Sequence, residues 1–163
     1  MCFDDRLAKL EAIEEIRLRV LAFFESCDNG GASGETYDAN ALADMWVPDG
    51  RFESGPVHCR TRDEIRALFL DLAQTFSLHY AGNHIVDIEP CHRRATGSWK
   101  AWESPILSGR AVWGCFEHRH EYTKRDGRWS WTRWDQTIHF FVPTERTWID
   151  EPRIVEQLIS KGA

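Results

Sequence analysis

The sequence predicts an α+β fold in which a cone-shaped, curved antiparallel sheet packs on N-terminal helices. Apolar residues recur at helical spacing over residues 5–27, which is typical of an amphipathic helix. After Gln74 the period changes, and polar and apolar residues tend to alternate as they do in strands. A sheet that wraps over helices forms a cone with an open mouth, lined by side chains of one parity. The alternating segments are 77–89, 93–106, 110–124 and 128–142.

The first half of the chain is expected to be mainly helical. The helix over residues 5–27 should stop at Asn29-Gly30-Gly31, because glycine commonly ends a helix. Residues 29–36 then form a Gly/Ser-rich loop, which is either a mobile lid or a simple insertion. A second, shorter helix is expected over residues 37–46.

Local signals mark the remaining elements. A short strand is expected over residues 51–54, after a Pro-Asp-Gly turn signal. The sequence Thr61-Arg62-Asp63-Glu64 has the form of a capping box and should begin a third helix. Arg125-Asp126-Gly127 is the clearest hairpin turn. The tail from Glu151 is a candidate for a last short helix.

Size and composition favour one acidic domain over residues 1–163. The net charge is −6 and no basic stripe is present, which argues against nucleic acid and anionic membranes as partners. No apolar run approaches the roughly 20 residues of a membrane span. The N-terminus lacks the apolar core of a signal peptide, so we expect a cytoplasmic protein. The five cysteines are dispersed, which favours neither a disulfide framework nor a zinc site.

His79, in the segment Leu78-His79-Tyr80, is the strongest candidate for a catalytic group. A histidine titrates near neutral pH, and a nearby carboxylate can fix its tautomer and stabilise its charged form. Asp28, at the end of the first predicted helix, is a candidate for that carboxylate. The alternatives are a half-buried strand histidine satisfied by the backbone and an ordinary helix-end carboxylate.

Other histidines offer competing sites. His84 lies five residues after His79, so on an unbroken strand only one of the two should face the cavity. His118 and His120 share a face, and a His-x-His strand can bind metal, but a metal site needs three or four convergent ligands. We therefore expect no bound metal. His118 is instead a candidate for a second polar group in the cavity.

Three motifs resemble the SnoaL-like branch of the nuclear transport factor 2-like superfamily, over roughly residues 5–145. They are the helix end Cys27-Asp28 followed by a helix with Trp46, the His79-Tyr80-x-Gly82-Asn83 sequence, and the segment 122–143. The motifs are similar to those of hexachlorocyclohexane dehydrochlorinase, bile-acid 7α-dehydratase and scytalone dehydratase. The resemblance implies a cone-shaped fold and assembly into a homodimer or homotrimer.

The same resemblance implies roles for individual residues. His79 matches the family's general base, Asp28 its carboxylate partner, and Arg133 a basic residue near the leaving group. Glu103 falls where the bile-acid dehydratase has an active-site aspartate. Phe23 stands where that enzyme has a tyrosine. Phe52 falls on an aromatic pocket wall, and Trp131 is expected to point inward with Arg133, whereas Trp134 has the opposite parity and is expected at an interface between subunits.

These observations favour a lyase that needs no cofactor and acts on a small molecule. Such an enzyme eliminates water, halide or formaldehyde from a bulky aromatic or polycyclic compound, with His79 as the base and Asp28 orienting it. Arg133 with Glu103 or His118 would bind polar substrate groups. Two alternatives remain open. One is an isomerase or cyclase that uses the same residues, and the other is a non-catalytic small-molecule-binding module.

Overall fold

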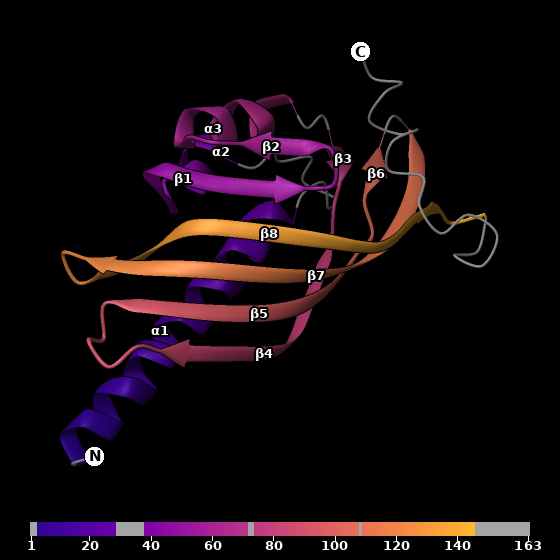
Figure 1. Cartoon of the computed structure of the whole chain (residues 1–163). Coiled ribbons are helices and arrows are strands. Elements are labelled where there is room, and N and C mark those ends of the chain that lie inside the picture. The colour runs from indigo at the N-terminus through magenta and orange to yellow at the C-terminus, as the bar shows by residue number, and fades with distance from the viewer. Residues whose placement is uncertain (1–2, 29–37, 72–73, 108, 146–163) are drawn as a thin grey trace.

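The computed structural model describes residues 3–28, 38–71, 74–107 and 109–145 (Figure 1). The glycine-rich segment 29–36 and the tail from Glu151 lie outside the described residues. The helices are α1 (Phe3–Cys27), α2 (Ala39–Ala43) and α3 (Arg62–Asp71). The strands are β1 (Trp46–Ser54), β2 (Val57–Cys59), β3 (Gln74–Phe76), β4 (His79–Ile88), β5 (Arg94–Glu103), β6 (Ile106–Leu107), β7 (Arg110–Arg125) and β8 (Arg128–Pro143).

A curved sheet with the order β2-β1-β8-β7-β5-β4 forms the body of the molecule, and α1 crosses one of its faces (Figure 1). The predicted antiparallel meander is present in β4, β5, β7 and β8. The sheet as a whole is mixed, however, because β1 pairs parallel to β8. The helix α3 and six strands, β2 to β7, separate β1 from β8 in the chain, which permits the parallel pairing.

Helix α1 packs on the sheet through an apolar stripe of its sequence. Its buried residues fall at helical spacing, so they lie on one side of the helix: Ala12, Ile16, Val20, Phe23, Phe24 and Cys27. On its flank, the carboxylate of Glu15 accepts hydrogen bonds from Lys124 Nζ at 2.6 Å and from Trp129 Nε1 at 3.0 Å. These contacts fix α1 against the β7–β8 hairpin. Within the described residues, no helix is long and apolar enough to cross a membrane.

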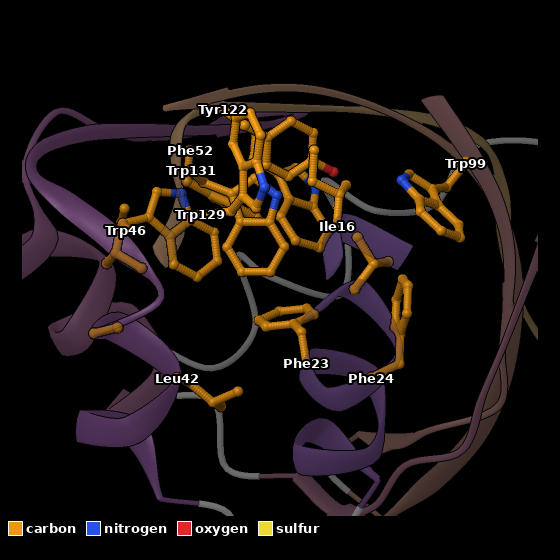
Figure 2. Close-up of a cluster of buried hydrophobic side chains, with 14 of the residues drawn as sticks. Ile16, Phe23, Phe24, Leu42, Trp46, Phe52, Trp99, Tyr122, Trp129 and Trp131 are labelled. Carbon is orange, nitrogen blue, oxygen red and sulfur yellow. The ribbon is translucent and has the colours of Figure 1, made fainter. Parts of the chain in front are cut away.

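Aromatic rings fill most of the core between α1, the short helices and β8 (Figure 2). Phe23 projects from α1 towards the buried tryptophans (Figure 2), and its ring centroid lies 5.5 Å from that of Trp131. Trp46 stacks on Trp134 with ring centroids 5.6 Å apart. Each such aromatic pair adds about 0.5–1.5 kcal/mol beyond the burial of its surface. The core therefore explains most of the tryptophans in the sequence.

Register shifts decide which side chains face inward. In the β7–β8 pairing, Tyr122 opposes Trp131 and Glu121 opposes Arg133, so Thr132 is an extra residue in β8. Such a bulge reverses the alternation of side chains beyond it. Trp129 and Trp131 are buried before the bulge, and Trp134 is buried after it. This reversal decides which β8 side chains beyond Thr132 face inward.

Two local signals correspond to local structure, but the Pro-Asp-Gly signal does not mark a turn, because residues 48–50 lie inside β1, and the second helix ends at Ala43, before Trp46. Asp126 and Gly127 have φ values of +50° and +75°, as a two-residue hairpin turn requires. Thr61 Oγ1 accepts a hydrogen bond from the backbone N–H of Glu64 at 3.2 Å, which caps α3. The Glu64 carboxylate accepts from the backbone N–H of Arg60 at 2.6 Å, one residue before the partner expected in a capping box.

Candidate active site

The end of α1 and the start of β4 bring Asp28 and His79 together. Asp28 is the first residue after α1, and its backbone N–H donates to the carbonyl of Phe24 at 2.9 Å. Its Oδ1 lies 2.8 Å from Nδ1 of His79 and also accepts the backbone N–H of His79 at 2.8 Å. One carboxylate oxygen thus holds both the ring and the main chain of the histidine.

This contact fixes the orientation of the His79 ring. An ionised carboxylate only accepts hydrogen bonds, so Nδ1 of His79 carries the proton that it donates to Asp28. In the neutral ring, Nε2 then has a free lone pair. Nε2 lies 3.7 Å from Oε1 of Glu103, which is too long for a hydrogen bond. The arrangement leaves Nε2 as the atom able to accept a proton from a bound molecule.

His79 and Glu103 lie in the wall of a cavity of about 110 Å³ between α1 and the sheet. For comparison, an engineered apolar cavity of about 150 Å³ binds benzene. The wall is largely aromatic, with a few polar groups, as is typical of small-molecule sites. The lining residues are Phe23, Phe24, Cys27, Phe52, Phe69, His79, Ala101, Glu103, Phe116, His118, Trp134 and Gln136.

Glu103 ends β5 directly opposite His79 in the β4–β5 register. Burial raises the pKa of its carboxyl group, and the negative charge of Asp28 raises it further, whereas His79 lowers it. Burial likewise raises the pKa of the neighbouring Cys27 thiol well above its usual value. Glu103 is therefore suited to hold a proton inside the cavity, and Cys27 is a poor nucleophile.

Two further polar side chains come from the long strands. His118 of β7 accepts a hydrogen bond at Nδ1 from Trp134 Nε1 at 2.9 Å. Gln136 of β8 accepts one at Oε1 from Ser54 Oγ at 2.6 Å. Gln136 was not among the predicted site residues, because the Thr132 bulge turns it inward and the sequence gives no clear signal of that bulge.

The structure brings together most of the residues singled out from the sequence. Asp28 binds His79, and the cavity wall includes Glu103, His118, Phe23 and Phe52.

Arg133 and two tryptophans are placed differently from the prediction. Arg133 lies on the outer face of the sheet, where its Nε donates to the Asp135 carboxylate at 2.8 Å, so the expected inward direction is wrong. Trp131 points inward as expected, but it is fully buried in the core and does not line the cavity as the predicted substrate-binding residue would. Trp134, expected at an outer interface, is 1% exposed and lines the cavity. The bulge at Thr132 accounts for Arg133 and Trp134, since it reverses the parity that the sequence suggested.

The structure places His84 and His120, the other candidate histidines, outside the cavity wall. Asn83 has a φ of +51° and the β4 register shifts between Gly82 and Ile85, so β4 is not the unbroken strand that was assumed. His84 stacks on Trp99 with ring centroids 4.9 Å apart and is not in the cavity wall.

His120 is buried, with Nδ1 2.6 Å from the Tyr122 hydroxyl. Over the described part of the chain, no group of three or more His, Cys, Asp or Glu side chains is arranged to hold a metal ion.

The curved sheet packed on a long N-terminal helix, with an interior cavity, defines an α+β cone of the nuclear transport factor 2-like type. The chain belongs to the SnoaL-like domain family, whose model matches residues 8–135. Among curated proteins, none matches the chain significantly.

Solved structures with the same fold include several proteins of low sequence identity. A type 2 hexachlorocyclohexane dehydrochlorinase is 18% identical, with a TM-score of 0.67 over 85% of this chain and 90% of that one. A putative scytalone dehydratase from Novosphingobium aromaticivorans is 13% identical, with a TM-score of 0.71 over 90% and 94%. A nuclear transport factor 2-like protein with a cystatin-like fold from the same organism is 24% identical, with a TM-score of 0.62 over 79% and 82%.

Proposed function

We propose that the protein is a cofactor-independent lyase that eliminates water or another small leaving group from a cyclic small molecule. The observation that carries the proposal is the 2.8 Å contact between Asp28 and His79 in the wall of an aromatic cavity. A histidine held in this way has a free Nε2 lone pair facing a site where a substrate is shielded from water. Positioned proton transfer of this kind typically accelerates a reaction by about 100- to 10,000-fold.

The proposed reaction begins with proton abstraction by His79. Nε2 takes a proton from a carbon atom next to an electron-withdrawing group, and the C–H electron pair forms the new double bond. The leaving group departs from the adjacent carbon with its bonding electrons. Asp28 stabilises the imidazolium that forms, because its carboxylate already accepts the Nδ1 proton.

Glu103 is the proposed acid for the leaving group. Its raised pKa favours the protonated carboxyl group, which is able to donate a proton to a departing hydroxyl. The carboxylate that results lies 3.7 Å from Nε2 of the imidazolium. Proton transfer from His79 to Glu103 after product release restores both groups. Arg133 has no part in this scheme, since it pairs with Asp135 on the outer face of the sheet.

The cavity size and its lining indicate which substrates to test first. A volume of about 110 Å³ suits about one six-membered ring, and the aromatic wall favours a flat or apolar one. A polycyclic substrate would place its reacting ring in the cavity and extend out of it. Two of the structural neighbours are named as a dehydrochlorinase and a putative dehydratase, and both names denote eliminations.

An isomerase is the second candidate, and the position of Glu103 favours it. A second proton carrier 3.7 Å from Nε2 of His79 allows a proton removed from one carbon to be returned at another. The two reactions differ in outcome: an isomerisation keeps every atom of the substrate, whereas an elimination releases a leaving group.

The proposal also includes self-association through the outer face of the sheet. Trp102, Trp113 and Phe140 form an aromatic cluster there, with ring centroids 5.4–5.7 Å apart. Trp102 is 44% exposed and the adjacent Tyr80 is 66% exposed. Large exposed aromatic side chains of this kind are enriched in subunit interfaces.

The test is a panel of single-ring and fused-ring compounds that carry a hydroxyl or halide one carbon away from an acidic C–H bond. Mass spectrometry of the products distinguishes loss of water or halide from isomerisation. His79→Ala is the inactive reference, and Arg133→Ala is the matched control, which should keep wild-type turnover. Tight binding of panel members without any turnover would contradict the proposal and support a binding module.

A further inference from the structure

A hydrogen bond from Trp134 fixes the tautomer of His118. The indole Nε1 donates to Nδ1 of His118 at 2.9 Å. An indole N–H is only a donor, so Nδ1 of His118 must be the acceptor and carries no proton. The proton of the neutral ring is therefore on Nε2. Trp134 is itself held by ring contacts with Phe23 at 4.7 Å and with His120 at 4.1 Å.

The surroundings of His118 keep it neutral. The ring lies between apolar groups, including Phe24 at 5.8 Å and Phe116 at 6.2 Å between centroids. The titratable groups in the same cavity wall are Cys27 from α1, His79 from β4 and Glu103 from β5, and His120 lies beside His118 on its own strand. Burial, together with the nearby His79, lowers the pKa of His118 from 6.5 to about 3. A second proton on the ring would have to bind at Nδ1, where the indole N–H of Trp134 already points. His118 is therefore a poor base at neutral pH.

His118 lines the cavity, and its Nε2–H is a buried donor. Among the described residues it has no hydrogen-bond acceptor. A buried donor without a partner costs about 1–3 kcal/mol, so an acceptor supplied by a ligand is favoured at this point. The same cavity wall contains His79, the proposed base.

We propose that His118 is a fixed hydrogen-bond donor that binds a carbonyl oxygen of the substrate through Nε2–H, with Trp134 as the residue that positions it. This inference rests on the proposed function and names its substrate class: ring compounds with a leaving group β to a carbonyl group. When His79 removes the α-proton, negative charge develops on that oxygen. A neutral N–H donor stabilises this charge without giving up its proton.

The inference is tested by NMR of the imidazole nitrogens, which needs no turnover. Long-range ¹H–¹⁵N spectra of the whole protein should show His118 as the neutral ring with Nε2 protonated, unchanged from pH 8 to pH 5. Assignment comes from the signals lost in His118→Gln. In Trp134→Phe the hydrogen bond to Nδ1 of His118 is removed, so we expect a mixture of the two neutral tautomers of His118. A proton on Nδ1 in the wild type, or titration of His118 in that range, would overturn the inference.

Ligand binding supplies the second readout. Acetophenone and ethylbenzene have similar shapes, but only acetophenone has a carbonyl acceptor. Acetophenone should shift the Nε2 proton resonance of His118 and bind about 2- to 12-fold more tightly than ethylbenzene, the range expected for one neutral hydrogen bond. His118→Phe should lose that preference and still bind both compounds. Equal affinities in the wild type, or an unshifted resonance, would refute the donor role and leave His79 untouched as the proposed base.

Discussion

Asp28 binds His79 through a single carboxylate oxygen, which accepts both the ring Nδ1–H and the backbone N–H at 2.8 Å. The two residues are separated by 51 positions and belong to the end of α1 and the start of β4. The backbone contact fixes the main chain of His79, and the ring contact fixes the side chain. The pair is therefore set by the packing of α1 on the sheet.

Asp28→Asn should lower kcat/KM by about 10- to 1,000-fold, less than the loss of His79 itself. The amide oxygen can still accept the backbone N–H of His79, but a neutral amide stabilises an imidazolium less than a carboxylate does. Asp28→Ala should also lower the melting temperature, because it leaves the His79 backbone N–H without this acceptor. Steady-state kinetics and thermal unfolding of both variants check this. Wild-type kcat/KM in Asp28→Asn would show that the carboxylate charge is not used.

Glu103→Gln should change the pH dependence of turnover. The raised pKa of Glu103 keeps its carboxyl group protonated to higher pH, and activity that needs this proton falls as pH rises through that pKa. Glutamine has the same shape and cannot donate an acidic proton, so the variant should be slower and lack this alkaline decrease. The measurement is kcat against pH for both proteins. If kcat of Glu103→Gln decreases at high pH as it does in the wild type, the decrease is caused by the titration of another group.

Acid should destabilise the fold through its buried histidines. The pKa of His118 is lowered from 6.5 to about 3, so between these values the unfolded chain binds a proton that the folded protein does not. The stability is complete above pH 6.5 and is lost as pH falls towards 3. Each such histidine contributes a slope of about 1.4 kcal/mol per pH unit. Urea unfolding at pH 7, 6 and 5 should show a smaller slope in His118→Gln than in the wild type. Equal slopes would contradict the burial of a neutral His118.

The chain should be a dimer or trimer at micromolar concentration, joined through the outer aromatic cluster. Light scattering should then give a small multiple of the 19.0 kDa chain mass. Trp102→Glu places a charge in the proposed interface and should reduce the mass to that of one chain. Leu70→Glu is the control, since Leu70 is 70% exposed on α3, away from the outer sheet face. A wild-type monomer would rule out this assembly.

Periodicity predicted the long elements, whereas the Pro-Asp-Gly signal predicted a turn at residues 48–50 that are part of β1. The helical spacing before residue 27 and the alternation after Gln74 correspond to α1 and to the four long strands β4, β5, β7 and β8. The parallel pairing of β1 with β8 was not predicted, because it joins segments far apart in the chain. Strand order depends on such long-range packing, which leaves no pattern within either segment.

The resemblance predicted the contact at the end of α1 and the start of β4, and the prediction failed on β8, where a bulge intervenes. Asp28 and His79 meet as the resemblance implied. Beyond Thr132 the parity of β8 is reversed, so Arg133 points outward while Trp134 and Gln136 point inward. A bulge depends on how two strands pair, and Thr132 is an ordinary strand residue with no turn signal beside it.

The most direct test of the account is the turnover of His79→Gln on a substrate identified from the panel. Glutamine keeps a polar side chain of similar length, so circular dichroism and the melting temperature should show an intact fold. We predict that kcat falls by at least about 100-fold, because the proposed reaction uses Glu103 in its protonated form and Nδ1 of His118 already accepts the Trp134 N–H. Arg133→Ala should remain at the wild-type rate in the same assay. Near-normal turnover by a folded His79→Gln protein would contradict the central claim that His79 is the base.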